Sequence, residues 1–177
     1  MSIGLWVVLA ACAVAVVTDV RFRKIPNWLV GTVLVVALTL GAIHGVQTFF
    51  IALGILVGVT IVGFFAYRSG WLGGGDVKFL AVGASALGLQ DTAPFLLYTA
   101  IGGGVLGLVW ALAVGRLGEI IKSIISNGKA VAHGGAIIVD KKKALKLPYG
   151  IAIAFGAVAV ALSHTYAPYL QLHFFGN

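Results

Sequence analysis

The chain has 177 residues, of which 60 % are apolar and only 10 % are charged, and its mean hydropathy is +1.08. Soluble domains carry about 25 % charged residues, so this composition excludes an ordinary soluble domain and indicates a protein whose solvent is lipid. The formal charge of +7 does not indicate nucleic-acid binding, because lysine and arginine mark the cytoplasmic loops of membrane proteins.

Six apolar runs follow one another along the chain. A membrane helix needs roughly 20 mostly apolar residues, and the runs lie at about 3–19, 28–46, 48–67, 77–90, 94–115 and 148–167. The fourth run is short, so its helix is expected to be tilted or partly sunk in a water-filled cavity. Asn27 is predicted to cap the second helix, and Pro94 to lie in the first turn of the fifth. Gly54 and Gly58, and Gly103 and Gly107, have the spacing of helix contacts.

The basic residues predict the orientation of these helices. Ten of the 12 Lys and Arg residues fall in the loops after the first and fifth runs, and the other two, Arg68 and Lys78, flank the loop after the third. They are Arg21, Arg23, Lys24, Arg68, Lys78, Arg116, Lys122, Lys129, Lys141, Lys142, Lys143 and Lys146. The positive-inside rule then places these loops in the cytoplasm. We therefore predict an all-α, polytopic membrane protein of about six helices with both termini outside, forming a single domain over residues 1–177.

The loop at about 116–147 is the one long loop between the predicted membrane helices. Its apolar residues at 117, 120, 121, 124 and 125 recur at helical spacing. This pattern indicates either a short amphipathic helix on the membrane surface or a simple extension of the fifth helix.

Two of the five acidic residues stand out by position, while Asp91, Glu119 and Asp140 are interpreted as solvated surface charges. Asp19 ends the first helix, where a carboxylate meets the unfavourable end of the helix dipole, so folding alone does not require it. The alternative for Asp19 is an ion pair with a loop arginine. Asp76 follows three glycines and opens the fourth helix, and its alternative role is an N-cap.

Both aspartates are predicted to lie at helix ends on the cytoplasmic side. Two carboxylates brought together there cannot easily both ionise, so the pair would share one proton. This is the arrangement of an aspartic protease, in which one member activates water and the other polarises the scissile carbonyl. The glycines before Asp76 would let a substrate backbone approach closely, because they lack a Cβ.

Three ordered segments carry a resemblance to a known family. The segment from Asp19 to Asn27, DVRFRKIPN, resembles the D-x-R-x-x-x-I-P-N motif of type IV prepilin peptidases. GGGDVK, from Gly73 to Lys78, resembles their G-x-G-D-x-K motif, and PYG, from Pro148 to Gly150, resembles their P-[FY]-G motif.

The resemblance implies an integral-membrane aspartic endopeptidase of the bacterial inner membrane. Such enzymes need no cofactor or metal, and cut the short basic leader from prepilins or pseudopilins at the cytoplasmic face, typically after a glycine. By motif, Asp19 and Asp76 would be the catalytic pair. The supporting residues would be Arg21, Pro26 and Asn27 in the first segment, Gly73, Gly75 and Lys78 in the second, and Pro148 and Gly150 in the third.

One departure from the family pattern concerns the larger, bifunctional members, which carry paired C-x-x-C motifs and also methylate the pilin. This chain begins directly with the first helix and has a single cysteine, Cys12. It therefore resembles the minimal subgroup that serves Flp-type pili of tight-adherence systems, with the pilus-assembly machinery as a possible partner and no methyltransferase activity expected. The basic loops either hold anionic membrane lipid or pair with an acidic residue after the cut site.

The histidines do not indicate a second kind of functional site. His44, His133, His164 and His173 are dispersed over both sides of the predicted membrane, so a shared metal site is not expected. Two rival functions stay open at this point. A small proton-coupled transporter would also use membrane aspartates, although usually near the midplane and within inverted repeats. A non-catalytic scaffold of a secretion machine would make both aspartates dispensable.

Overall fold

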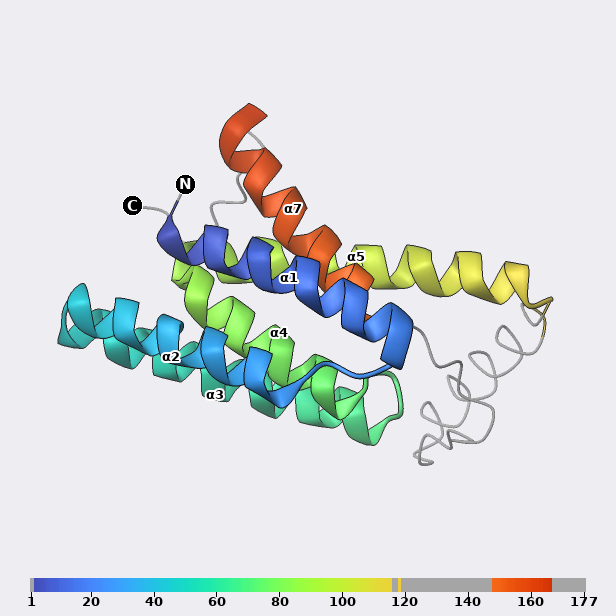
Figure 1. The fold of residues 1–177 in the computed structure, drawn as a ribbon, viewed down its shortest axis with the longest axis horizontal. Coiled ribbons are helices and arrows are strands. Elements are labelled where there is room, and N and C mark those ends of the chain that lie inside the picture. Colours follow the sequence, from blue (N-terminus) through green and yellow to red (C-terminus); the bar gives the residue numbers. More distant parts are fainter. Residues whose placement is uncertain (1, 116–117, 119–147, 167–177) are drawn as a thin grey trace, which may run out of the picture.

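The computed structural model describes residues 2–115, 118 and 148–166. These residues form six helices and no strand (Figure 1). The helices are α1 (Ile3–Phe22), α2 (Asn27–Ile43), α3 (Val46–Arg68), α4 (Gly74–Leu87), α5 (Leu89–Ala113) and α7 (Gly150–Tyr166). Each predicted apolar run corresponds to one helix, so the prediction of an all-α fold is confirmed.

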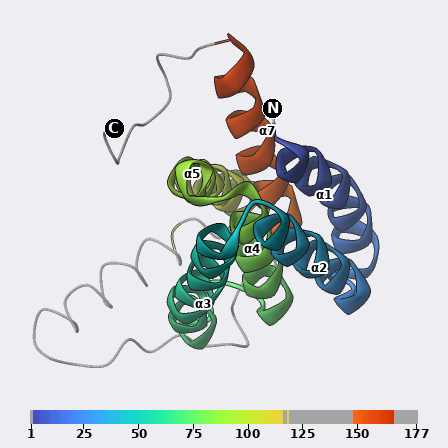
Figure 2. The ribbon, with the colours of Figure 1, turned by 90° about the vertical axis from the view of Figure 1, so that its left-hand side faces the viewer.

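The short helix α4 lies at the centre of the bundle. It packs against α1, α2, α3 and α5, and Figure 2 shows it enclosed by its neighbours. Most of its residues are buried, including Phe79 and Ser85. The hydroxyl of Ser85 donates a hydrogen bond to the carbonyl of Ala52 in α3, at 2.8 Å. The short fourth run thus faces protein, where a polar group with a hydrogen-bond partner is tolerated.

The outer helices expose large apolar side chains. α1, α3 and α5 are each long and apolar enough to cross a membrane. Many of their large side chains are more than half exposed, among them Val17, Phe50, Val62, Phe65, Ile101 and Leu112. A continuous apolar surface of this kind is unfavourable in water and favourable in a bilayer. The fold is thus that of a membrane protein, while the number of spans and the outside location of both termini stay predictions.

One end of the bundle collects the described positive charges. The ends of α1 and α3 and the beginnings of α4 and α7 lie at this end (Figure 1). The Lys and Arg residues among the described positions are Arg21, Arg23, Lys24, Arg68 and Lys78, and all of them belong to these segments or to the link between α1 and α2. This agrees with the predicted orientation. The loop cations and the predicted amphipathic helix fall within 116–147 and so lie outside the described residues.

Two predicted helix boundaries are wrong. Asn27 is the first residue of α2, and Pro26 occupies the cap position without a side-chain hydrogen bond. Pro94 lies inside α5 rather than in its first turn, because α5 already begins at Leu89. The reason is Gly88, whose φ of 82° lets the chain turn from α4 into α5 without a longer loop.

The predicted glycine contacts are confirmed only in part. An added Cβ at Gly54 or Gly58 would meet nothing within 4 Å, so these two glycines make no helix contact among the described residues. Gly103 of α5, by contrast, packs directly against the side chain of Tyr149.

Candidate active site

A pocket of about 470 Å³ opens at the positively charged end of the bundle, and both Asp19 and Asp76 line it. Three parts of the chain form its walls: the end of α1 with its link to α2, the α3–α4 loop with the start of α4, and the residue before α7. The lining residues besides the two aspartates are Arg23, Lys24, Ile25, Asn27, Gly70, Trp71, Leu72, Gly73, Gly74, Gly75, Lys78 and Tyr149. The two aspartates are 57 positions apart in the sequence, and the fold brings both to one cavity.

Asp19 is held by the beginning of α7. It lies in the last turn of α1 and is only 5 % exposed. Its Oδ2 accepts a hydrogen bond from the backbone N–H of Gly150, at 2.8 Å. The first N–H groups of a helix have no partner within the helix, and that end carries partial positive charge. Gly150 therefore compensates for the unfavourable position of Asp19 at the end of its own helix.

Asp76 is the third residue of α4 and is half-buried. Its Oδ2 accepts a hydrogen bond from the N–H of Gly73, at 3.0 Å. Gly73 is the N-cap, so the alternative role of Asp76 as an N-cap is wrong, and the carboxylate instead folds back over the first turn. Asp76 precedes the apolar run at 77–90 and lies outside that predicted span. Burial, and then the negative charge of Asp19, raise the pKa of Asp76 to about 6, although the Gly73 hydrogen bond acts in the opposite direction.

Glycines border both carboxylates at close range. A Cβ added at Gly73 would lie 2.7 Å from Oδ2 of Asp76, and one at Gly150 would lie 3.1 Å from Oδ2 of Asp19. Neither position accepts a side chain without moving a carboxylate. Gly75 differs, because its added Cβ would lie 3.7 Å from Cβ of Ile25, which is an ordinary contact. Packing among the described residues therefore does not require glycine at position 75.

The other predicted supporting residues fall into two groups. Asn27, Gly73, Gly75 and Lys78 line the pocket beside the aspartates, and Gly150 contacts Asp19 directly. Arg21, Pro26 and Pro148 are not among the lining residues. Arg21 is exposed and its guanidinium lies 5.7 Å from the ring of Phe22. The carbonyls of Pro26 and Pro148 accept hydrogen bonds from the first turns of α2 and α7, so these prolines shape the backbone rather than the pocket.

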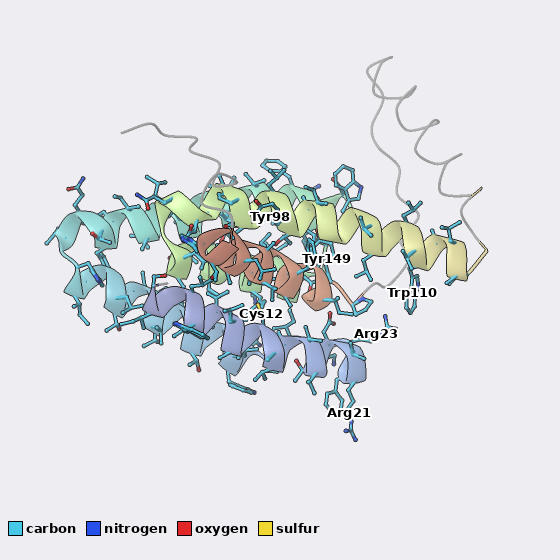
Figure 3. All side chains as sticks on the ribbon, turned by 90° about the horizontal axis from the view of Figure 1, so that it is seen from above. Cys12, Arg21, Arg23, Tyr98, Trp110 and Tyr149 are labelled. Atoms are coloured by element: carbon cyan, nitrogen blue, oxygen red, sulfur yellow. The ribbon has the colours of Figure 1, made fainter. Side chains whose placement is uncertain are left out.

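Sequence reasoning missed several residues that line the pocket. Tyr149 is the most informative, since it reaches the pocket from beside α5 (Figure 3). Its place between Pro148 and Gly150 in the third motif was the available signal. Arg23 was interpreted as a loop charge and, with Arg21, as an alternative ion-pair partner of Asp19, and its guanidinium also lies 5.6 Å from the ring of Trp110 in α5 (Figure 3). Such contacts between distant helices leave no local pattern in the sequence.

The opposite end of the bundle contains an ion pair that corrects a further prediction. Asp91 at the start of α5 lies 2.8 Å from Nε2 of His164 in α7, and its side chain is 16 % exposed. Asp91 is therefore not a simply solvated surface charge. The pair joins α5 to α7 at the end far from the two aspartates.

Comparison with known proteins identifies the family of the chain. A model of the type IV leader peptidase family matches residues 6–108, which is more than half of the sequence and includes both Asp19 and Asp76. The chain belongs to the type IV leader peptidase family. No curated protein and no solved structure matches. Membership of this family makes the protein a leader peptidase of prepilin substrates, and together with the long apolar helices it indicates a membrane enzyme.

Proposed function

We propose that this peptidase is an integral-membrane aspartic endopeptidase that uses Asp19 and Asp76 to remove the leader of prepilins or pseudopilins. The observation that carries the proposal is the single pocket lined by both carboxylates, at the end of the bundle where the described cations gather. With the positive-inside rule, that end is the cytoplasmic face of the bacterial inner membrane. The whole of residues 1–177 would form one peptidase domain that crosses the membrane six times, with both termini outside.

The two aspartates would divide the chemistry according to their surroundings. Asp76, whose pKa is raised to about 6, would hold the shared proton and donate it to the oxygen of the scissile carbonyl. Asp19 would accept a proton from the attacking water, whose oxygen forms the new bond to the carbonyl carbon. The proton on Asp19 would then pass to the leaving nitrogen as the C–N bond breaks, and the carbonyl oxygen would return its proton to Asp76 as the C=O bond re-forms, which restores the starting state of the pair.

The supporting residues would act through the backbone and through charge. Gly75 would leave room for the substrate main chain beside Ile25, and Gly73 and Gly150 would hold the two carboxylates by their N–H groups. Pro26 and Pro148 would shape the backbone of the first and third motif segments beside the pocket, and Arg21 would flank the first of these segments. Asn27 and Lys78 would contact the substrate or, for Lys78, the phosphate of an anionic lipid.

The Flp-type, tight-adherence subgroup is the finer assignment that we propose. It is supported by the single cysteine, Cys12, since the paired C-x-x-C motifs of the methylating members require four. On this assignment the partners are an Flp-type prepilin and the pilus-assembly machinery, and cleavage proceeds without methylation of the product.

The direct test is co-expression of the peptidase with a candidate Flp-type prepilin, with leader removal scored by a gel shift. The proposal expects a shift with the wild type and none with Asp19→Asn. A shift that persists in Asp19→Asn would favour a peptidase of another type or a scaffold that recruits a second protease.

A further inference from the structure

The side chain of Tyr149 is fitted against bare backbone in the middle of α5. A Cβ added at Gly103 would lie 2.6 Å from the hydroxyl oxygen of Tyr149 and 2.8 Å from its Cε2 and Cζ. Real Cβ atoms essentially never approach other atoms so closely, so only glycine at position 103 leaves the ring where it is. Figure 3 shows Tyr149 between α5 and the start of α7.

The backbone of the same residue forms the beginning of α7. The carbonyl of Tyr149 accepts a hydrogen bond from the N–H of Ile153, at 3.1 Å, which closes the first helical turn. The next residue, Gly150, donates its N–H to Oδ2 of Asp19, at 2.8 Å. The ring that contacts α5 and the N–H that contacts Asp19 thus belong to consecutive residues. The packing of the ring and the position of the donor are therefore linked through one short stretch of backbone.

We propose that Tyr149 is a positioning residue for Asp19, supported from behind by Gly103. In this arrangement α5 fixes the ring, the ring fixes the first turn of α7, and the Gly150 N–H orients the carboxylate. The inference rests on the proposed catalytic role of Asp19. It assigns the effect to the ring rather than to the hydroxyl, because the hydroxyl has no hydrogen-bond partner among the residues that the structure describes.

Neighbouring glycines in α5 provide a matched pair of variants. Gly103→Ala would force the ring of Tyr149 to move, whereas a Cβ at Gly104 would meet no described residue within 4 Å. Both substitutions lie in the same helix and favour the helix to the same extent. A difference between them therefore reports the contact with Tyr149.

The experiment measures kcat, KM, the pH profile and thermal stability in one detergent, with a synthetic peptide that carries a basic leader, a glycine and an apolar segment. Displacement of a catalytic group by about 1 Å can cost about a hundredfold in rate. We expect Gly103→Ala to lower kcat by about ten- to a hundredfold with little change in KM, and to shift the pH profile of kcat. Gly104→Ala should match the wild type.

Variants of the ring separate positioning from direct catalysis. Tyr149→Phe should keep kcat within about threefold of the wild type, whereas Tyr149→Ala should lose about as much as Gly103→Ala. The double variant Gly103→Ala with Tyr149→Ala should be no worse than Tyr149→Ala alone, because no ring remains to be displaced.

Equal rates for Gly103→Ala and Gly104→Ala would overturn the inference, and so would additive losses in the double variant. A Tyr149→Phe variant as slow as Tyr149→Ala would also overturn it, because that result would place the hydroxyl in the reaction itself. Each is read in an enzyme whose cleavage has first been shown to require Asp19. If Asp19→Asn cleaves normally, the proposed function fails instead, whatever the α5 variants do.

Discussion

Replacement of Gly75 by alanine separates the needs of the substrate from the needs of the fold. In the free enzyme the new Cβ would lie 3.7 Å from Cβ, 3.9 Å from the nitrogen and 4.0 Å from the oxygen of Ile25, all ordinary contacts. The φ angle of Gly75 is not positive, so alanine fits its backbone conformation. Alanine is also the better helix former, by roughly 0.5–1 kcal/mol. We therefore expect the thermal stability of Gly75→Ala to equal or slightly exceed that of the wild type.

The effect on turnover should be much larger. The added methyl group would project beside Ile25, which lines the pocket that holds both aspartates. A substrate backbone displaced there by about 1 Å would lose about a hundredfold in rate, so we expect kcat/KM to fall by about ten- to a hundredfold. The assay is peptide cleavage and thermal unfolding in the same detergent. Gly31→Ala is the control, because its Cβ would meet nothing within 4 Å on α2. Equal, small losses in the two variants would refute the close approach of a substrate backbone.

Three further predictions concern the site and the topology. Cleavage should fall as the pH rises through about 6, when Asp76 loses its proton. Over the range from pH 3.8 to about 6 the wild type should also lose stability relative to Asp76→Asn, because a carboxyl of raised pKa favours the folded state only while it is protonated. A stability difference that does not change over this range would contradict the raised pKa of Asp76. Gly73→Ala should lower kcat more than Gly75→Ala, since its Cβ would lie 2.7 Å from Oδ2 of Asp76; comparable kcat values would argue against a fixed carboxylate. In a Cys12→Ser background, an impermeant thiol reagent applied to intact cells should label Gln90→Cys and spare Ser126→Cys, and the reverse labelling would rule out the predicted orientation.

The helices were predictable because their signals are local. Apolar runs, the fourth of them short, predicted all six helices, and the alternation of basic loops placed the ends of α1 and α3 on the same side as the beginnings of α4 and α7. The boundaries were less predictable, since the φ of 82° at Gly88 lets α5 begin at Leu89, so that Pro94 lies inside the helix rather than in its first turn.

The residues of the candidate site that lie in the sequence motifs could be predicted, whereas the contacts between distant residues could not. Asp19 and Asp76 were singled out from helix-end position and from the glycines, and the structure places both in one pocket. The support for Asp19 by Gly150 could be expected only loosely, because a contact across 131 residues depends on how α1 and α7 pack. The contact of Tyr149 with Gly103 gave no signal at all, since a missing Cβ becomes meaningful only when its neighbour is known.

The measurement that tests the central claim most directly is prepilin cleavage by Asp19→Asn, Asp76→Asn and the double variant, at equal amounts of folded, membrane-inserted enzyme. If the two carboxylates act as one unit, each single variant abolishes cleavage and the double variant is no worse. Membrane insertion and stability in detergent should stay near those of the wild type. Full cleavage by either single variant would contradict the assignment of this pair as the catalytic centre.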